Sequence, residues 1–176
     1  MRGWKALGTA LLVIAALAPL AYAQSKGRHA SLGADDYAEI QRLYARYAWA
    51  LDSRAGNGAA YASVYTPDGE FVYGTTKTVG RDKLAVQFGS SRNPSAKVSP
   101  HHFVTNLMIS PTEGGARGSA YVLVVTAGEA GKAPSIAGGT YSDLLVKTGE
   151  GWRFKRREIV MDGLIPAGLE QLLSMR

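Results

Sequence analysis

The apolar residues of this chain change their spacing at Pro100, and this change limits the folds that the chain can adopt. Before Pro100 they recur at intervals of three and four, which predicts an amphipathic helix over residues 36–52. Beyond Pro100, runs rich in valine, isoleucine, threonine and aromatic residues alternate with glycine-rich turns, which predicts strands over residues 101–110, 116–126, 139–148 and 152–161. Helices followed by closely connected strands are typical of an α+β domain with an antiparallel sheet.

Shorter elements are expected between the long helix and Pro100. The pattern predicts short helices over residues 59–65 and 80–88, and a strand over residues 70–73 after a proline-glycine turn. Asp36 and Glu39 have capping-box spacing, so we expect Asp36 to be the N-cap of the long helix. Three helices would therefore precede the main run of strands.

The first 23 residues have the features of a cleavable signal peptide. Arg2 and Lys5 precede an apolar core over residues 6–20, and Ala21-Tyr22-Ala23 forms an A-x-A cleavage site. An uncleaved membrane anchor would start in a similar way, but the small residues favour cleavage after Ala23. We therefore expect a secreted or periplasmic protein without stable membrane insertion. Its parts would be a flexible N-terminus over 24–33, one domain over 34–162 and a tail over 163–176 that can form a short helix.

Composition excludes several kinds of chemistry. The chain has no cysteine, which excludes thiol catalysis, cysteine-ligated zinc and disulfides. The formal charge of +6 falls to +4 when cleavage of the signal peptide removes Arg2 and Lys5, because 18 basic and 14 acidic side chains remain. The densest basic run, Lys155-Arg156-Arg157, is expected on the solvated face of a terminal strand. No aromatic platform or DNA-reading motif accompanies this run, so no nucleic-acid partner is expected.

Polar side chains on the strand after Pro100 are candidates for a ligand site. Strict alternation puts His102, Asn106 and Met108 on one face, where a few polar groups would stand among apolar neighbours, as in small-molecule pockets. Histidine can act as a general acid or base, so His102 is a catalytic candidate; a solvated or core histidine is the alternative. His101 should point to the opposite face, so the two neighbouring histidines are not expected to share a metal ion.

The long helix supplies two possible partners for His102. Asp52 lies at the edge of the apolar stripe, where a buried carboxylate needs a hydrogen-bond partner. If that partner is His102, Asp52 would orient the imidazole ring; the backbone of the following turn is the alternative. Tyr47 lies at the centre of the stripe. It is therefore either a pocket residue or an ordinary core residue.

Three more tyrosines, Tyr65, Tyr121 and Tyr141, are candidates for the wall of the same pocket, because each belongs to an element that should meet the helix. Asp143 shares a strand face with Tyr141, so it either pairs with an arginine across the sheet or reaches a cavity. The chain has no P-loop, nucleophile-elbow, zincin or dinucleotide-binding motif. No metal or other cofactor is therefore expected.

The order of these motifs resembles the SnoaL-like proteins of the nuclear transport factor 2-like superfamily. The resemblance spans roughly residues 34–162 and rests on Tyr47-x4-Asp52, Val64-Tyr65-Thr66-Pro67-Asp68-Gly69-Glu70-Phe71, Gly80 before a helix, His101-His102-Phe103-Val104-Thr105-Asn106 and Gly151-Trp152-Arg153-Phe154. It implies a cone in which a curved antiparallel sheet wraps around three N-terminal helices and encloses an apolar pocket for a small organic molecule. It also implies a homodimer built through the sheet.

The motifs are most similar to those of the scytalone and bile-acid dehydratases, which perform acid-base chemistry without a cofactor. The resemblance implies that His102 removes a proton next to a carbonyl, Tyr47 donates a hydrogen bond to the enolate oxygen, and Asp52 holds His102. Asn106 and the three tyrosines above would contact the substrate of this lyase or isomerase. Residues 116–126 lack the acidic residue that such dehydratases often have there, which weakens the case for elimination. A non-catalytic periplasmic binding protein is the alternative.

Overall fold

The computed structural model describes residues 31–90, 100–127 and 134–164. The expected signal peptide, most of the expected flexible N-terminus and nearly all of the expected tail lie outside these residues. The elements are α2 (Ala34–Ser53), α3 (Ala59–Ala62), β1 (Tyr65–Tyr73), β2 (Thr76–Val79), α4 (Arg81–Ser90), β3 (Pro100–Thr112), β4 (Gly115–Thr126), β5 (Ser135–Thr148) and β6 (Gly151–Leu164). The α+β class is confirmed.

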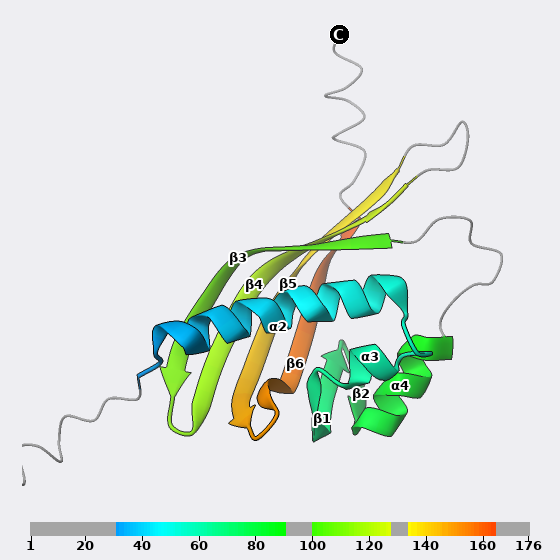
Figure 1. Ribbon diagram of the computed structural model, residues 1–176. Coiled ribbons are helices and arrows are strands. Elements are labelled where there is room, and N and C mark those ends of the chain that lie inside the picture. Colours follow the sequence, from blue (N-terminus) through cyan, green and yellow to red (C-terminus); the bar gives the residue numbers. More distant parts are fainter. Residues whose placement is uncertain (1–30, 91–99, 128–133, 165–176) are drawn as a thin grey trace, which may run out of the picture. The chain divides into compact units, whose positions relative to one another are not determined.

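Six strands form one curved sheet in the order β2-β1-β6-β5-β4-β3 (Figure 1). Neighbouring strands run antiparallel, as expected, except for β1 and β6, which are parallel. No hairpin joins β1 to β6, so their direction is not imposed by a short turn. Strand β2 was not expected from the sequence; it pairs with β1 across the turn at Gly74.

Helix α2 packs along one face of this sheet, while α3 and α4 lie beside β1 and β2 (Figure 1). The buried positions of α2 follow the spacing of three and four that predicts the helix; they are Ile40, Leu43, Tyr44, Tyr47 and Ala50. Together with residues of the sheet, these side chains form the core of the domain. The opposite face of the sheet, which we call the outer face, carries no helix among the described residues (Figure 1).

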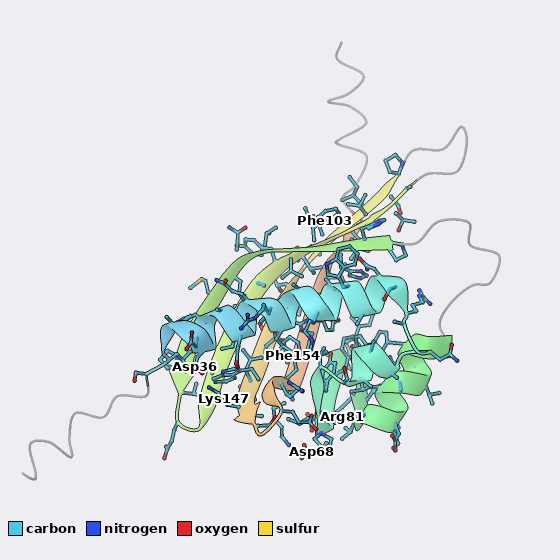
Figure 2. The ribbon with its side chains drawn as sticks, viewed as in Figure 1. Asp36, Asp68, Arg81, Phe103, Lys147 and Phe154 are labelled. Atoms are coloured by element: carbon cyan, nitrogen blue, oxygen red, sulfur yellow. The ribbon has the colours of Figure 1, made fainter. Side chains whose placement is uncertain are left out.

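The start of α2 differs from the expectation. Gly33 is the N-cap and Asp36 lies within the first turn, where its Oδ2 accepts a hydrogen bond of 3.0 Å from the backbone N–H of Gly33. Asp36 Oδ1 accepts a hydrogen bond of 2.8 Å from Lys147 Nζ (Figure 2). It also accepts one of 3.0 Å from Trp152 Nε1. Asp36 therefore ties the first turn of α2 to strands β5 and β6.

The contacts of Asp36 predict how stability depends on pH. The hydrogen bond from Lys147, followed by those from Trp152 and Gly33, lowers the pKa of Asp36 from 3.8 to about 2. A depressed carboxyl pKa stabilises the folded state above about pH 3.8, and this contribution is lost as the pH falls through about 2. Asp36→Asn should therefore lower the melting temperature at pH 6. The difference in melting temperature between the variant and wild type should disappear as the pH falls from 4 to 2.

Thermal melts followed by circular dichroism from pH 2 to 7 would check this expectation. Asp35→Asn is the matched control, because it removes a carboxylate from the same turn but none of these hydrogen bonds. It should lower the melting temperature less at pH 6. A gap between wild type and Asp36→Asn that stayed constant down to pH 2 would contradict the assignment.

A β-bulge at Asn106 exchanges the two faces of β3 halfway along the strand. The register with β4 shifts between Thr105 and Met108, and Asn106 has a φ of 54°. Asparagine tolerates this left-handed conformation better than most residues. Beyond the bulge, Leu107 and Ile109 pack against the core and Met108 is exposed. Strict alternation is therefore correct up to Thr105 and wrong beyond it, because the bulge inserts one residue.

Candidate functional site

Asp52 and His102 contact each other at the end of α2. His102 Nδ1 lies 2.5 Å from Asp52 Oδ1, and the backbone N–H of His102 donates a hydrogen bond of 3.0 Å to Asp52 Oδ2. Both side chains are mostly buried, with exposed fractions of 13% for His102 and 16% for Asp52. A single carboxylate therefore fixes both the ring and the backbone of His102.

This contact determines which ring nitrogen can react. Because Nδ1 faces a carboxylate oxygen, it carries the proton, and Nε2 is left to accept one from a ligand. A carboxylate in this position also stabilises the imidazolium that forms after proton uptake. The pair therefore has the geometry of a general base with its orienting group.

Two connected pockets lie between α2 and β3, on either side of His102. One has a volume of about 380 Å³ and extends toward Asp52 and Pro100, and the other has a volume of about 530 Å³ and extends toward Asn106. The two pockets share four lining residues, Ala48, Trp49, His102 and Phe103. We call the two pockets together the α2–β3 groove.

Two aromatic side chains that sequence reasoning did not select border this groove. Trp49 is 75% exposed and Phe103 is 53% exposed, and both line the two pockets beside His102. Trp49 falls off the apolar stripe of the long helix, and a tryptophan outside the buried face is a sequence signal for a contact surface. That signal could have identified it.

The tyrosines expected at the site lie elsewhere. Tyr47, Tyr65 and Tyr141 are fully buried, and none of them lines the α2–β3 groove. Their rings pack together in the core, with centroids 5.7 Å apart for Tyr47 and Tyr141 and 6.4 Å apart for Tyr47 and Tyr65. Burial raises the pKa of Tyr65 and Tyr141, so their hydroxyls stay neutral over the physiological range.

Arg157 lies at the centre of this aromatic core and has no exposed surface. Its Nε and Nη2 donate hydrogen bonds of 2.8 and 2.7 Å to the two oxygens of Asp143. The guanidinium carbon lies 4.0 Å from the ring centroid of Tyr47 and 3.9 Å from that of Tyr141. Burial alone would lower the pKa of Arg157, but the Asp143 carboxylate holds it well above the ordinary value.

The expectation that Arg157 belongs to a solvated basic surface is therefore wrong. The register between β5 and β6 pairs Leu144 with Arg156 and then Leu145 with Phe154, so Lys155 is an inserted residue. This bulge turns Arg157 inward, directly opposite Asp143. Of the two alternatives for Asp143, pairing with an arginine across the sheet is the one observed.

Tyr44 connects this ion pair to the groove. It lines the larger pocket of the groove, and its hydroxyl donates a hydrogen bond to Asp143 Oδ2. Burial and the neighbouring Asp143 charge raise its pKa, so Tyr44 stays protonated. Gly118 makes room for this contact, because a Cβ at that position would lie 2.1 Å from the Tyr44 hydroxyl oxygen.

The other two expected site residues, Asn106 and Tyr121, both border a depression on the outer face. Asn106 lines the larger pocket of the groove and also a depression of about 580 Å³ on the outer face. Tyr121 lines only the outer depression and is 58% exposed. The expected site residues thus separate into three groups: Asp52 with His102 and Asn106 at the groove, three tyrosines in the core, and Tyr121 outside.

A family model of the SnoaL-like domain matches residues 33–158, which cover most of the chain. The chain belongs to the SnoaL-like domain family. The resemblance seen in the sequence is therefore confirmed. No curated protein matches the sequence of this SnoaL-like domain.

Solved structures show the same fold. ActVI-ORFA from Streptomyces coelicolor is 25% identical, with a TM-score of 0.64, and the match covers 72% of this chain and 96% of that one. A proposed scytalone dehydratase from Novosphingobium aromaticivorans is also 25% identical, with a TM-score of 0.59 and coverage of 73% and 85%. A Nostoc punctiforme protein of unknown function with a cystatin-like fold is 22% identical, with a TM-score of 0.64 and coverage of 76% and 96%. These likenesses confirm the expected fold class of the SnoaL-like domain.

Two further structural features concern the described part of this SnoaL-like domain. Within residues 31–90, 100–127 and 134–164, no three histidine, cysteine, aspartate or glutamate side chains are grouped so that they could hold a metal ion. In the same ranges, no helix combines the length and the apolar character that crossing a membrane requires.

Proposed function

We propose that the α2–β3 groove binds a small, largely apolar organic molecule and that His102, oriented by Asp52, moves a proton on this molecule without a cofactor. The observation that carries the proposal is the 2.5 Å contact between His102 Nδ1 and Asp52 Oδ1, at the place where the two pockets meet. A SnoaL-like domain with a proposed scytalone dehydratase among its structural neighbours is consistent with this chemistry.

The proposed reaction begins with a ligand carbonyl in the groove. His102 Nε2 removes a proton from the carbon next to the carbonyl and forms an enolate, while Asp52 stabilises the resulting imidazolium. Transfer of that proton from the His102 imidazolium to the hydroxyl group on the β-carbon, which leaves as water, would complete a dehydration. Return of the proton at another carbon would complete an isomerisation. The aromatic ring of Trp49 offers a flat apolar contact for the ligand.

Tyr47 remains in the proposal as the donor to the enolate oxygen. Its ring is enclosed by Tyr61, Tyr141, Phe154 and Arg157, so this role requires the ligand to reach the interior beyond the groove. Tyr47→Phe removes only the hydroxyl and keeps the packed ring. Loss of turnover in this variant would support the role, and unchanged turnover would assign Tyr47 to the core.

Exchange of carbon-bound protons tests the proposal, because dehydration and isomerisation both begin with removal of the same proton. A panel of aromatic ketones and β-hydroxy ketones is incubated with the protein in D₂O, and the signal of the proton next to the carbonyl is followed by proton NMR. Enzyme-dependent loss of that signal for any member supports proton abstraction. If members of the panel bind but none exchanges faster with protein than without it, the catalytic proposal fails.

A non-catalytic binding protein is the second candidate. The observation that favours it is that, among the described residues, Asp52 is the only acidic residue lining the groove, and its two oxygens are already engaged by His102. Elimination needs an acid to protonate the leaving hydroxyl, and no second carboxyl from the described part of the chain lines the groove, so the His102 imidazolium alone would have to supply that proton. Ligand binding by calorimetry without proton exchange would identify a binder.

We also propose that the protein is exported, because residues 1–23 have the charge, apolar length and A-x-A site of a signal peptide. The mature chain should then begin at Gln24 in the secreted or periplasmic fraction of a bacterial host. Intact-mass measurement of protein from that fraction checks this expectation. A chain that keeps residues 1–23 would contradict it.

A homodimer through the outer face is a further part of the proposal. Large apolar side chains from four neighbouring strands are exposed there: Phe103, Met108, Tyr121, Leu123, Leu144 and Val160. Six such side chains expose on the order of 100 Å² each, which approaches the roughly 800 Å² per partner of a stable interface. Aromatic residues and methionine are typical of such interfaces. The register places Arg117 and Arg156 opposite Leu144, so the charges of this face lie toward the Leu144 end, away from Phe103 and Leu123.

Substitution at the centre of this face tests the dimer. Tyr121→Arg should convert a dimer to a monomer at micromolar concentration, because it places a charge in an apolar contact. Size-exclusion chromatography with light scattering measures the mass. Tyr73→Arg on β1 is the matched control, since Tyr73 is also a half-exposed tyrosine but lies at the other end of the sheet. A monomeric wild type would contradict the proposal.

A further inference from the structure

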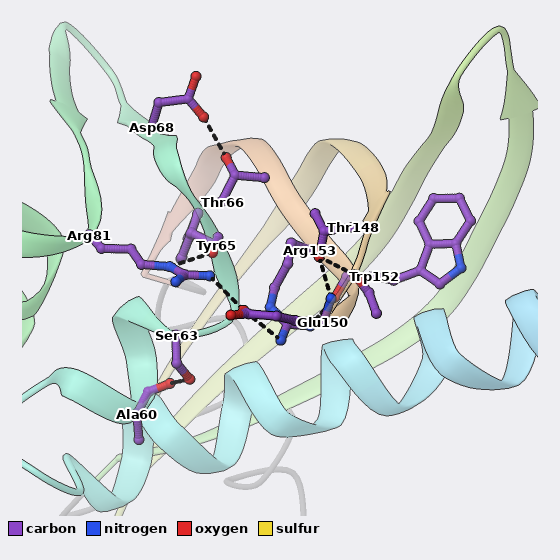
Figure 3. Close-up of polar contacts among 11 residues, drawn as sticks. Ala60, Ser63, Tyr65, Thr66, Asp68, Arg81, Thr148, Glu150, Trp152 and Arg153 are labelled. Atoms are coloured by element: carbon purple, nitrogen blue, oxygen red, sulfur yellow. Dashed lines mark hydrogen bonds and ion pairs between the residues drawn. The ribbon is translucent and has the colours of Figure 1, made fainter.

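Two guanidinium groups converge on one carboxylate oxygen at the turn between β5 and β6 (Figure 3). Arg81, the first residue of α4, and Arg153 on β6 each place Nη2 3.4 Å from Glu150 Oε2. Strong charge-assisted N–H···O hydrogen bonds are shorter, at about 2.7–2.9 Å. Neither arginine therefore forms a tight pair with Glu150.

The two arginines are fixed in place, whereas the acid is not. Arg81 Nε donates a hydrogen bond of 2.8 Å to the carbonyl oxygen of Tyr65, and Arg153 Nη1 donates one of 2.8 Å to the carbonyl oxygen of Trp152. The exposed fractions of the side chains are 30% for Arg81 and 9% for Arg153, but 67% for Glu150. The cations are thus held by the backbone, and the carboxylate reaches them from solvent.

Arg153 has a donor that remains unused. Its Nε is buried and has no hydrogen-bond partner among the described residues. A buried unpaired donor is costly, so it is the kind of group that a ligand can satisfy. Arg153 Nε is therefore still available to donate a hydrogen bond to a ligand near Arg81.

Positive charge exceeds negative charge around Arg153. Burial, followed by the nearby charge of Arg46, lowers its pKa. Glu39 is another acid close by; within the described part of the chain its Oε2 is buried without a hydrogen-bond partner and forms no ion pair with Arg153. Among the described residues, Glu150 is the acid that forms ion pairs with Arg81 and Arg153, each at 3.4 Å.

We propose that Arg81 and Arg153 form a binding site for a small oxyanion, a carboxylate or phosphate group, whose place Glu150 takes when no ligand is bound. Planar guanidinium groups suit such ligands, because each can donate two parallel hydrogen bonds to two oxygens. The exposed Glu150 side chain can turn into solvent and leave both arginines to the incoming anion. None of these residues lines the α2–β3 groove, so the site is independent of the proposed reaction.

Titration with inorganic phosphate tests the site. The purified protein is titrated at constant ionic strength, and the affinity is followed by amide chemical shifts in NMR. Glu150→Gln should bind phosphate about tenfold more tightly, because the competing internal carboxylate is gone, and Arg81→Gln should bind about tenfold more weakly. Arg117→Gln, which removes an exposed arginine on β4, is the matched control and should leave the affinity unchanged.

Three outcomes would overturn the proposal. They are an unchanged affinity in Glu150→Gln, an unchanged affinity in Arg81→Gln, and equal losses in Arg81→Gln and Arg117→Gln, which would indicate an unspecific charge effect. Acetate added to the phosphate-bound protein distinguishes the ligand classes. Competition by acetate supports a site for carboxylates as well as phosphates, and its absence supports a phosphate site.

Discussion

Replacing Asp143 with alanine should lower the free energy of unfolding by about 3–5 kcal/mol, because Arg157 would keep its charge in the core without a partner. The guanidinium has no exposed surface, and both of its hydrogen bonds to side chains go to Asp143. The Tyr44 hydroxyl would lose its acceptor in the same variant. Urea unfolding followed by circular dichroism measures the loss.

A double variant separates the ion pair from the packing around it. Asp143→Leu combined with Arg157→Met replaces both charges with apolar side chains of similar length, so no charge is left buried alone. Such replacements are often neutral or stabilising, and the double variant should regain most of the lost stability. If Asp143→Ala does not fold, the double variant still tests whether the unpaired charge, rather than the packing, causes the loss of stability. An equally large loss in the double variant would assign the effect to packing rather than to charge.

The exposed pair of Lys155 and Asp68 is the control. Both side chains are largely exposed, at 42% and 69%, and Lys155 precedes the buried arginine by only two residues. Exposed pairs of this kind contribute about 0–1 kcal/mol, so Lys155→Ala should change the free energy of unfolding little. A loss below about 1 kcal/mol in Asp143→Ala, equal to that of the control, would show that the buried pair does not stabilise the fold.

Sequence periodicity predicted the elements of this fold better than the direction of individual side chains. The stripe of Ile40, Leu43 and Tyr47 gave the long helix and its buried face, because a helix without an irregularity keeps its period. Two errors of side-chain direction in the sheet come from bulges, at Asn106 in β3 and at Lys155 in β6. Tyr121, which was also expected at the pocket, faces outward on β4, whose register with β5 has no bulge. A bulge inserts one residue and exchanges the faces of every residue beyond it.

The candidate site was predicted in part. Asp52 and His102 meet because a carboxylate at the edge of an apolar stripe and an imidazole near the start of the facing strand are each costly to bury alone. The tyrosines could not be assigned from sequence, since an inward tyrosine has the same spacing whether it packs in a core or lines a pocket. The guanidinium group of Arg157 lies between the rings of Tyr47 and Tyr141. The spacing of apolar residues cannot predict that a charged side chain fills this space.

If the proposed proton transfer occurs, His102→Ala should reduce its rate by about 10²–10⁴-fold, the usual contribution of a general acid or base. The loss should appear in the rate and not in ligand affinity, because the apolar walls of the groove remain. His101→Ala is the matched control: His101 is the preceding residue and lines the smaller pocket, but no side-chain hydrogen bond joins it to Asp52. It should retain most of the rate.

Asp52→Asn tests the orienting role separately from the base. The amide keeps the size of the side chain and one acceptor for the backbone N–H of His102, but it can no longer stabilise an imidazolium. The rate should therefore fall while ligand affinity and melting temperature stay near those of wild type. Because proton exchange measures the first step alone, His102→Ala and Asp52→Asn should lose exchange together. Exchange that survives in His102→Ala would place the base elsewhere, and binding without exchange in wild type would leave the groove as the site of a carrier.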